Sequence, residues 1–349
     1  MRVAVLLSGG VDSSAALRLL QRRGEQVEAF YLKIWLEEEL SFLGDCPWED
    51  DLRFARAVCA QAGLPLHTVA LQSEYREIVV ERALEELRLG RTPSPDIFCN
   101  RQIKFGEFWR QLDNGWDKVA TGHYARIEER GDKSFLLRAP DPVKDQTYFL
   151  SYLSQAQLQR SLFPIGHLTK VQVRHLAEDL DLPTKSRSDS QGICFLGKIS
   201  YPDFVSFHLG ERAGDIVERD SGSKLGEHRG HWFYTIGQRH GLGLGGGPWF
   251  VVEKQTEDNT VFVSHKDGQD HSARSLFCVD DLNWITEAPT TNRLKVKIRH
   301  SPELEDCRIE PAGDNGYSVR LDTPDPGISP GQHAVFYEGM VCLGGGVIR

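Results

Sequence analysis

Hydrophobic residues in the first third of the chain fall into short apolar runs that alternate with stretches of helical spacing. Runs typical of buried strands lie at 3–7, 27–32, 66–70 and 118–121. Helical patterns lie between them, at 13–23, 49–62, 73–89 and 101–112. This alternation predicts an α/β fold with a parallel sheet covered by helices, and ligands of such sheets bind beyond the carboxyl ends of the strands.

The pattern changes in the second half of the chain. A further helical stretch is expected from about 154 to 180, with Thr169 capping its last helix. Beyond about residue 200 glycines become frequent, and short alternating strands are expected at 231–236, 249–253 and 260–264. From about 273 only strand patterns remain, at 293–300, 317–321, 334–337 and 340–343. We therefore expect an α/β domain over 1–200, a small central β-rich domain over 201–272 and a C-terminal β-barrel over 273–349.

The first strand–helix junction carries the most informative motif, Leu-Leu-Ser-Gly-Gly-Val-Asp-Ser over residues 6–13. Glycines let backbone N–H groups approach phosphate oxygens, and the following helix N-terminus adds partial positive charge. Neither a Walker motif nor Gly-x-Gly-x-x-Gly follows the strand, so the loop predicts a different kind of pyrophosphate site. Asp12 is placed to hold Mg²⁺ between phosphates. The alternative is an ordinary glycine turn with a Ser or Asp helix cap.

Composition narrows the class of protein. The 349 residues are 40% hydrophobic and 26% charged, a common mix for globular proteins, and no run of eighteen apolar residues exists. A strand begins at Val3, which leaves no room for a signal peptide and favours a cytoplasmic location. The net charge of −9 argues against holding nucleic acid by bulk charge alone, although local basic faces decide contact.

Two of the seven cysteines have surroundings that suit chemistry, and no two cysteines stand in Cys-x-x-Cys spacing. Cys99 ends the segment Thr-Pro-Ser-Pro-Asp-Ile-Phe-Cys, and it is expected near a helix start beside Arg101 and Lys104, which favours a thiolate. A buried cysteine acting as a small hydrophobe is the alternative. Cys194 lies in a polar loop downstream of Lys185, a weak signal by itself.

The motifs together resemble the tRNA-specific 2-thiouridylases, a family of the PP-loop ATP pyrophosphatase superfamily, along nearly the whole chain. The matching motifs lie at 8–14, 92–100, 103–105, 120–125, 144–146, 192–195, 226–228, 237–243 and 331–346. The resemblance implies an enzyme that uses ATP and Mg²⁺ to adenylate the C2 oxygen of the wobble uridine of tRNA. Persulfide sulfur then replaces that oxygen to give 2-thiouridine. A cysteine desulfurase or a relay protein would supply the sulfur, and the enzyme would act as a cytoplasmic monomer.

The resemblance also implies residue roles. Cys99 would be the nucleophile, Cys194 the persulfide carrier, and Asp96 a group that orients the base or acts as acid or base, unless it only forms a turn. The implied ATP contacts are Leu6, Leu7, Ser8, Gly9, Gly10, Val11, Asp12, Ser13, Leu32 and Gly122. The implied target-base contacts are Ser94, Pro95 and Asp96. The implied contacts to the rest of the tRNA are His123, Lys144, Asp145, Gln146, Arg299, His300 and Gln332.

The chain departs from the family pattern at four of its motif positions. Ser94 stands where Asn is usual, Leu32 where Met is common, Leu6 where Gly is usual and His300 where Tyr is common. The change at Ser94 alters one hydrogen bond to the base, whereas a Leu-for-Met exchange is tolerated against adenine. The cysteines and the aspartate are unchanged, so the departures leave the expected reaction in place.

The segment 293–299 carries a cation at every second position. On a strand, Arg293, Lys295, Lys297 and Arg299 would share one face and track tRNA phosphates, or that face would simply be solvated. The glycine-rich segment 237–247 would order on RNA or form a plain hairpin connection.

Three other functions compete with tRNA thiolation. The first is another PP-loop ligase that adenylates a small molecule, which would not need two sulfur-bearing cysteines. The second is a non-catalytic tRNA-binding protein, and the third is an iron–sulfur thiolase with Cys99, Cys194 and Asp96 as ligands. The sequence also leaves open whether persulfide attacks the base directly or Cys99 first releases hydrosulfide.

Overall fold

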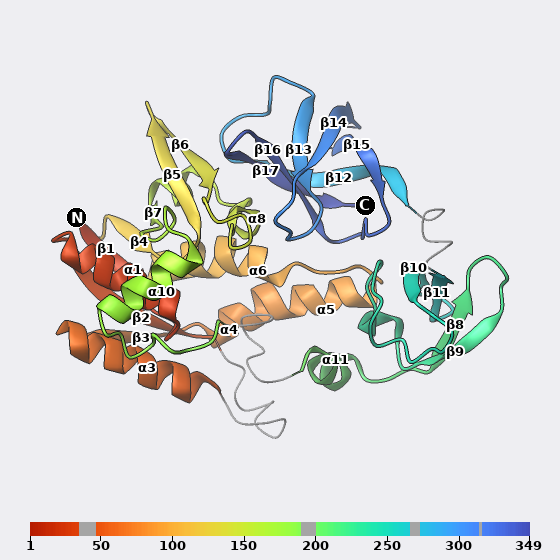
Figure 1. Cartoon of the computed structure of the whole chain (residues 1–349), viewed down its shortest axis with the longest axis horizontal. Helices are drawn as coiled ribbons and strands as arrows, with labels where there is room; N and C mark the ends of the chain where they lie inside the picture. Colours follow the sequence, from red (N-terminus) through yellow and green to blue (C-terminus); the bar gives the residue numbers. More distant parts are fainter. Residues whose placement is uncertain (35–46, 190–199, 266–272, 314–315) are drawn as a thin grey trace.

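The computed structural model describes residues 1–34, 47–189, 200–265, 273–313 and 316–349. The described chain forms three sheets, one in each of three consecutive parts of the sequence, with helices gathered around the first (Figure 1). No helix among these residues has the length and apolar character needed to cross a membrane.

The first sheet has five strands in the order β3-β2-β1-β4-β7, and every pairing is parallel. Its strands are β1 (Arg2–Leu6), β2 (Gln26–Lys33), β3 (Leu66–Ala70), β4 (Lys118–Ala120) and β7 (Ser161–Leu162). The central strand β1 is buried on both faces, as its unbroken apolar run requires. The predicted parallel α/β sheet is therefore confirmed, with strand ends within two residues of those expected.

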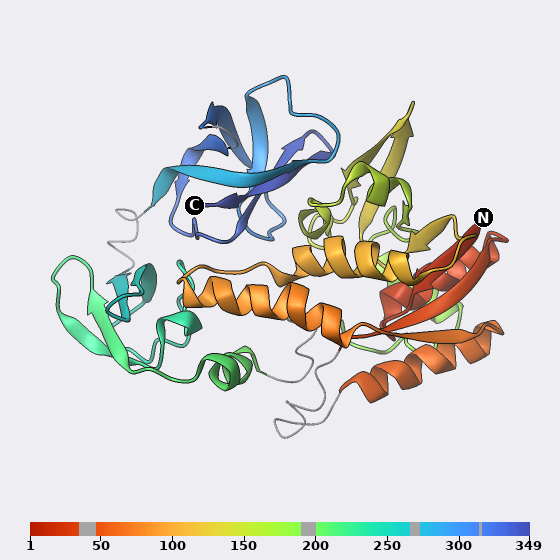
Figure 2. The ribbon, with the colours of Figure 1, turned by 180° about the vertical axis from the view of Figure 1, so that it is seen from behind.

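Helices cover both faces of this sheet. Val3 and Val5 pack against Leu17 of α1 (Val11–Arg22) and Val58 of α3 (Pro47–Ala62), whereas Leu6 faces the opposite side. That side carries two long helical segments that lie side by side (Figure 2). One comprises α4 (Gln72–Tyr75), the π-helical η2 (Arg76–Val80) and α5 (Glu81–Arg88). The other comprises α6 (Pro95–Phe98), the π-helical η3 (Cys99–Glu107) and α7 (Phe108–Gln111).

The chain then forms a hairpin and three short helices before the second sheet. These are β5 (Ala125–Arg130), β6 (Lys133–Arg138), α8 (Thr147–Leu150), α9 (Gln155–Gln159) and α10 (Lys170–Asp179). Thr169 caps α10 as predicted: its side chain accepts from the Gln172 amide, and the Gln172 side chain accepts from the Thr169 amide.

The central part is smaller and mixed. It begins with α11 (Tyr201–Leu209), a helix that the sequence pattern did not predict. The sheet that follows has the order β10-β11-β8-β9, from β8 (Gly214–Glu218), β9 (Lys224–His228), β10 (Trp249–Gln255) and β11 (Thr260–His265). The strand expected at 231–236 is wrong, because His231–Phe233 forms the 3₁₀ turn η4 instead.

The last part is a closed antiparallel barrel of six strands, as predicted. They are β12 (Arg274–Trp284), β13 (Arg293–Lys297), β14 (Glu305–Ala312), β15 (Gly316–Asp325), β16 (His333–Glu338) and β17 (Val341–Ile348). The ring closes because β12 pairs with both β15 and β17. Strand β17 also pairs with β6, through Val341 with Leu137 and Cys342 with Leu136. The hairpin of the α/β part thus extends the barrel sheet.

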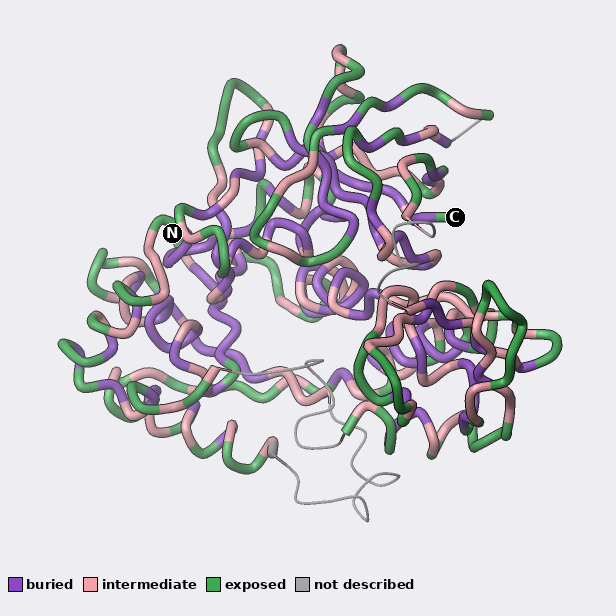
Figure 3. Tube along the Cα trace, turned by 45° about the vertical axis from the view of Figure 1, so that its right-hand side comes forward, coloured by how far each residue is buried: buried purple, intermediate pink, exposed green. Residues whose placement is uncertain are grey.

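Buried residues form separate cores in these parts, with exposed loops around them (Figure 3). The largest core lies under the two long helical segments, and it reaches Val335 and Tyr337 of the barrel. The α/β part and the barrel are therefore packed together through side chains as well as through backbone pairing.

Candidate active site

The loop between β1 and α1 has the geometry of an anion site. Its Gly9 has φ +77°, and a Cβ there would run into the backbone carbonyl of Asp51. The hydroxyls of Ser13 and Ser14 donate to the Gly10 carbonyl, over 3.1 and 2.8 Å. Gly10 is the N-cap of α1, and no described side chain caps the helix. The first amides of α1 are therefore uncapped by any of these side chains, which contradicts the alternative of a Ser or Asp cap.

The carboxyl end of β4 meets this loop. A Cβ on Gly122 would lie 2.6 Å from the Ser13 nitrogen and 2.7 Å from the Asp12 carbonyl carbon. Only a glycine allows the two backbones to approach so closely. Leu32, at the end of β2, is partly buried in the core beneath the loop. The structure thus brings Gly122 against Asp12 and Ser13, three of the residues at which the resemblance places ATP.

The Asp12 carboxylate is engaged in a buried network. Lys170 Nζ donates to both of its oxygens over 2.8 and 2.9 Å, and the Tyr124 hydroxyl donates to Oδ1 over 2.7 Å. Lys170 is the first residue of α10, directly after its Thr169 cap. Among the described residues no group of three His, Cys, Asp or Glu side chains could hold a metal ion.

Asp189 joins the same network. Its carboxylate accepts from Lys144 over 2.6 Å and Arg174 over 2.5 Å, and it lies 2.8 Å from Lys170 Nζ. Burial alone would raise the pKa of Asp189, but hydrogen bonds from Lys144 and Lys170 outweigh burial and hold the pKa well below its ordinary value. Sequence reasoning missed Lys170 and Arg174, because nothing in a helical pattern marks which lysine reaches a loop far away in the chain.

A further cation binds the loop itself. Arg187 donates to the Gly9 carbonyl and to Asp51 Oδ1, both over 2.8 Å. The network thus has four basic side chains and three carboxylates beside the uncapped helix. The Asp141 carboxylate also lies here and accepts from the Lys144 and Lys170 amides, so the charges of the network are balanced. Lysine and arginine side chains beside a helix N-terminus suit a polyphosphate.

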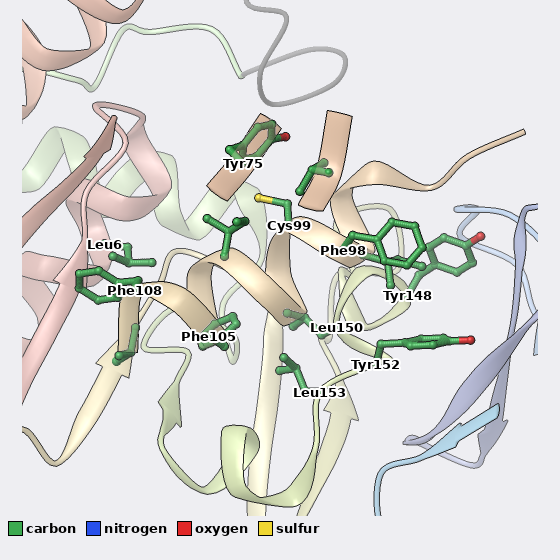
Figure 4. Packing of buried hydrophobic residues seen from close by; sticks show 14 of the residues in the cluster. Leu6, Tyr75, Phe98, Cys99, Phe105, Phe108, Tyr148, Leu150, Tyr152 and Leu153 are labelled. Atoms are coloured by element: carbon green, nitrogen blue, oxygen red, sulfur yellow. The ribbon is translucent and has the colours of Figure 1, made fainter. Parts of the chain in front are cut away.

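Cys99 lies deep in the core rather than in an open pocket (Figure 4). Only 1% of it is exposed, and it is enclosed by Tyr75, Phe98 and neighbouring apolar side chains. Burial raises the pKa of Cys99 to about 11, against the opposing effect of Lys104. The predicted thiolate is therefore wrong for this conformation. The physical reason is that α6 runs directly into η3, so Cys99 lies inside a continuous helical segment and not at its exposed start.

The segment predicted to contact the base, residues 94–96, leads into this core. Ser94 occupies the N-cap position of α6 and is buried, Pro95 is the first helical residue, and Asp96 is half-buried. The charge of Asp96 is close enough to act on His300 of the barrel. The other cysteine of the predicted pair, Cys194, lies outside the described residues.

Three of the predicted tRNA contacts have structural partners instead of open surfaces. His123 is buried and hydrogen-bonds with the Thr121 hydroxyl over 2.7 Å, and burial lowers its pKa well below the usual value. Asp145 is fully buried, and Gln146 accepts from the Tyr124 amide over 2.9 Å through its side chain. In this structure, these residues make contacts within the protein that stabilise the site.

The other predicted tRNA contacts are more accessible, but each has a partner. Lys144 pairs with Asp189, Arg299 forms two bonds to Asp325 over 2.9 and 2.7 Å, and the His300 ring lies 4.7 Å from that of Phe149. Gln332 reaches across to the segment before α6, as described below.

The prediction that the four cations of 293–299 share one face is also corrected. Lys297 is only 1% exposed and pairs with Asp145, so it does not share an open face with the other cations. The remaining cations are exposed or half-exposed, and each has an acidic partner: Asp322 for Arg293, Asp306 for Lys295 and Asp325 for Arg299. Acidic residues on β14 and β15, invisible in a one-strand pattern, neutralise these cations.

A separate cavity of about 340 Å³ lies in the central part, far from the loop at 6–13. It is lined by residues 239–244 and 247–249 of the glycine-rich segment. Its exposed Arg239 and His240 are the only charged or titratable side chains of this lining.

Family models and relatives agree with this geometry. A model described as the tRNA methyl transferase HUP domain matches residues 1–198. Models of a tRNA methyl transferase PRC-barrel domain and an aminomethyltransferase beta-barrel domain match 202–265 and 274–348. The tRNA-specific 2-thiouridylase MnmA 2 of Bacteroides fragilis is 45% identical over 355 residues, covering 100% of both chains.

The chain belongs to the tRNA-specific 2-thiouridylase family. A second 2-thiouridylase, from Porphyromonas gingivalis, is 42% identical and covers 100% of this chain and 99% of its own. Among solved structures, a 4-thiouridine synthetase in complex with RNA and ATP covers 60% of this chain and 50% of its own at 15% identity. Its TM-score is 0.34, a likeness too distant to support an argument. The resemblance to the 2-thiouridylases is therefore confirmed over the full length.

Proposed function

We propose that this protein is an ATP-dependent tRNA-uridine 2-sulfurtransferase that converts the wobble uridine of tRNA into 2-thiouridine. The observation that carries the proposal is an uncapped glycine loop flanked by lysine and arginine side chains, in a chain related to 2-thiouridylases over its whole length. In this proposal residues 1–200 are the catalytic domain, 201–272 a small central domain, and 273–349 a barrel that contacts tRNA.

ATP occupies the loop at 6–13, with Leu32 and Gly122 beside the nucleotide. The phosphate oxygens accept from the uncapped amides of α1, and Lys170 and Lys144 exchange their aspartate partners for phosphate. The C2 oxygen of uridine is a poor leaving group, and adenylation converts it into AMP, a good one. The lysine and arginine side chains beside the loop stabilise the pyrophosphate that this step releases.

Mg²⁺ fits the site only in part. Asp12 is the one carboxylate on the loop, and Lys170 and Tyr124 already engage it. The ion would therefore rest mainly on phosphate oxygens, with Asp12 as its single protein ligand. When bound, it neutralises phosphate charge.

The uridine base leaves its stack and enters beside Ser94, Pro95 and Asp96. Ser94 has a hydroxyl in place of the longer amide side chain of the Asn usual in the family, which alters one hydrogen bond to the base. Asp96 is half-buried at the first turn of α6, where a carboxylate can orient the base or exchange a proton with it.

Two thiols deliver the sulfur. The terminal sulfur of a persulfide on Cys194 bonds to C2 and AMP leaves, while Cys99 attacks the Cys194 sulfur, leaving thiouridine and a Cys99–Cys194 disulfide that a cellular thiol reduces. In the alternative route Cys99 attacks the persulfide first and releases hydrosulfide beside the base. Either route requires Cys99 to leave its buried, protonated state and become a thiolate.

The test is nucleoside analysis of tRNA after incubation with the protein, ATP, Mg²⁺ and a persulfide source. Wild-type protein should form 2-thiouridine at the wobble position, and Cys99→Ser and Cys194→Ser should form none. The matched control is Cys278→Ser, which removes an exposed thiol from β12 of the barrel and should retain full activity. Pyrophosphate exchange with ATP in the absence of tRNA, without any thiouridine, would instead favour a ligase for a small molecule.

The remaining assignments follow from this activity. The protein works in the cytoplasm as a monomer, and it receives sulfur from a cysteine desulfurase or a relay protein. Gel filtration of the protein alone tests the monomer, and transfer of labelled sulfur from a desulfurase to Cys194 tests the donor.

A further inference from the structure

The loop from β15 to β16 is hydrogen-bonded to the segment that precedes α6. Gln332 Nε2 donates to the carbonyls of Thr92 and Pro93, both over 3.2 Å. The Thr92 amide donates to the Pro330 carbonyl over 2.8 Å, and the Thr92 hydroxyl hydrogen-bonds with that of Ser329 over 3.0 Å. Backbone and side-chain bonds therefore fix the same two residues.

Gly331 makes this contact possible. Its φ is +88°, and a Cβ there would lie 2.8 Å from Arg91 Cβ and 2.9 Å from both the nitrogen and the oxygen of Thr92. A side chain at this position would therefore be strained and would push the segment away. The backbone at Gly331 therefore packs directly against the backbone at Thr92, and this contact leaves little room for either segment to move.

The same loop also reaches the far end of the segment. His333 follows Gln332 directly and is fully buried, with its ring 5.8 Å from that of Phe98 and 4.9 Å from that of Tyr152. Its carbonyl accepts from the Tyr148 hydroxyl over 3.1 Å. Residues 329–333 thus hold both ends of the stretch from Thr92 to Phe98. Between those ends lie the base contacts at 94–96, and Cys99 follows immediately.

We infer that residues 329–333 form a clamp by which the barrel positions the base-contact segment, and that Gln332 is a positioning residue of this clamp. Both hydrogens of its amide nitrogen are used on Thr92 and Pro93, which fixes the side chain against this segment and leaves only its oxygen to accept from RNA. The inference rests on the proposed function, because it concerns the placement of the uridine that is thiolated. Misplacement of a reacting group by about 1 Å can cost about a hundredfold in rate.

Kinetics of Gln332→Ala and Thr92→Val in the full chain test the clamp. At saturating ATP and tRNA we expect the single-turnover rate of thiolation to fall about tenfold or more. The dissociation constant for tRNA should stay within about twofold of wild type, since the Gln332 amide nitrogen and the Thr92 hydroxyl bond to the protein itself. Thr92→Ser keeps the hydroxyl that meets Ser329 and should recover most of the rate. Thermal unfolding of each variant shows that the fold is retained.

Gly331→Ala and Gly339→Ala form a matched pair of backbone variants. Both glycines have positive φ, +88° and +57°, but a Cβ on Gly339 meets nothing within 4 Å. Both variants therefore carry similar local strain, whereas only Gly331→Ala displaces Thr92. We expect the rate loss in Gly331→Ala alone.

Two results would overturn the clamp while leaving the proposed function intact. One is a Gln332→Ala protein that thiolates at the wild-type rate when saturated but binds tRNA more weakly, as a simple RNA contact would. The other is equal loss of rate in both glycine variants. Failure of the wild-type protein to form 2-thiouridine would overturn the proposed function, and the clamp's role in it would fall too.

Discussion

At the scale of single residues, the chain places its chemistry in surroundings that its motifs do not reveal. The motifs identify Cys99 and the residues of the glycine loop, but the pKa of Cys99 and the partners of Asp12 depend on residues far away in sequence. A helix start with nearby cations suggested a thiolate, whereas packing under Tyr75 and Phe98 gives a protonated thiol. Local sequence therefore does not predict the charge state of Cys99 or the partners of Asp12.

Cys99 should be protected from alkylation in the free protein. With a pKa of about 11, roughly one thiol in a thousand is ionised at pH 8, and the side chain is also buried. We expect iodoacetamide to label it at least about a hundredfold more slowly than the exposed Cys278, with mass spectrometry of the peptides as the measurement. Because the pKa is raised, labelling should quicken as the pH rises towards 11. Equal labelling of the two cysteines at pH 8 would contradict the buried position.

Lys170 should contribute to ATP affinity, although no motif marks it. Lys170→Met keeps the length of the side chain but removes the charge that links Asp12 and Asp189. Loss of one charge-assisted bond to phosphate should weaken ATP binding about tenfold or more, measured by calorimetry. Lys185→Met is the control, because Lys185 is exposed and pairs only with Asp181 among the described acids. Unchanged affinity in Lys170→Met would mean that its role is confined to the ion pairs seen here.

At the scale of elements, strand and helix positions in the α/β part were predictable from periodicity. β3 lies at 66–70 as expected, and the Thr169 cap is found where predicted. The β5–β6 hairpin and α11 were missed. The hairpin is stabilised by pairing with β17, two hundred residues later in the chain. The local sequence of the hairpin does not indicate this partner, so local patterns did not predict it.

The close contact between the end of β4 and the start of α1 leads to a prediction for the Gly122→Ala variant, which adds one methyl group. Gly122→Ala places a Cβ against the Ser13 nitrogen and the Asp12 carbonyl carbon, so the first turn of α1 must move. We expect ATP affinity to fall about tenfold or more, because the uncapped amides no longer converge on one phosphate. Gly245→Ala has free space around its new Cβ and serves as the control. An unaltered dissociation constant for ATP in Gly122→Ala would exclude this loop as the nucleotide site.

At the scale of the whole molecule, the barrel is joined to the α/β part by backbone pairing, hydrogen bonds and a buried ion pair. It adds a strand partner to the β5–β6 hairpin, it holds Thr92 through the clamp, and it inserts Lys297 into the α/β part. The net charge of −9 and the paired cations of 293–299 leave little unpaired positive charge on that strand. Buried contacts therefore position the barrel against the α/β part. A basic surface on the strand at 293–297 contributes little.

The buried ion pair between Asp145 and Lys297 should make the two parts unfold together. Lys297 Nζ lies 3.1 Å from Asp145 Oδ2, both side chains are fully buried, and Arg138 also donates to this oxygen over 2.8 Å. Asp145→Asn leaves Lys297 buried without its counter-charge, which should cost about 3–5 kcal/mol in the free energy of unfolding by denaturant. Lys297→Met should cost less, because Arg138 still neutralises the carboxylate. The double variant should then be more stable than the sum of the single losses predicts.

Acid provides an independent check on the same pair. Burial alone would raise the pKa of Asp145, but Lys297 and Arg138 outweigh it and lower the pKa below its ordinary value of 3.8. A carboxyl with a lowered folded-state pKa stabilises the protein fully above its unfolded pKa, and this stability is lost as the pH falls through the folded pKa. The stability gap between wild type and Asp145→Asn should therefore stay constant from pH 7 to about pH 5 and shrink in stronger acid. If this stability difference instead disappears between pH 7 and pH 5, Lys297 of the barrel does not keep Asp145 ionised. The ion pair would then not explain why the two parts unfold together.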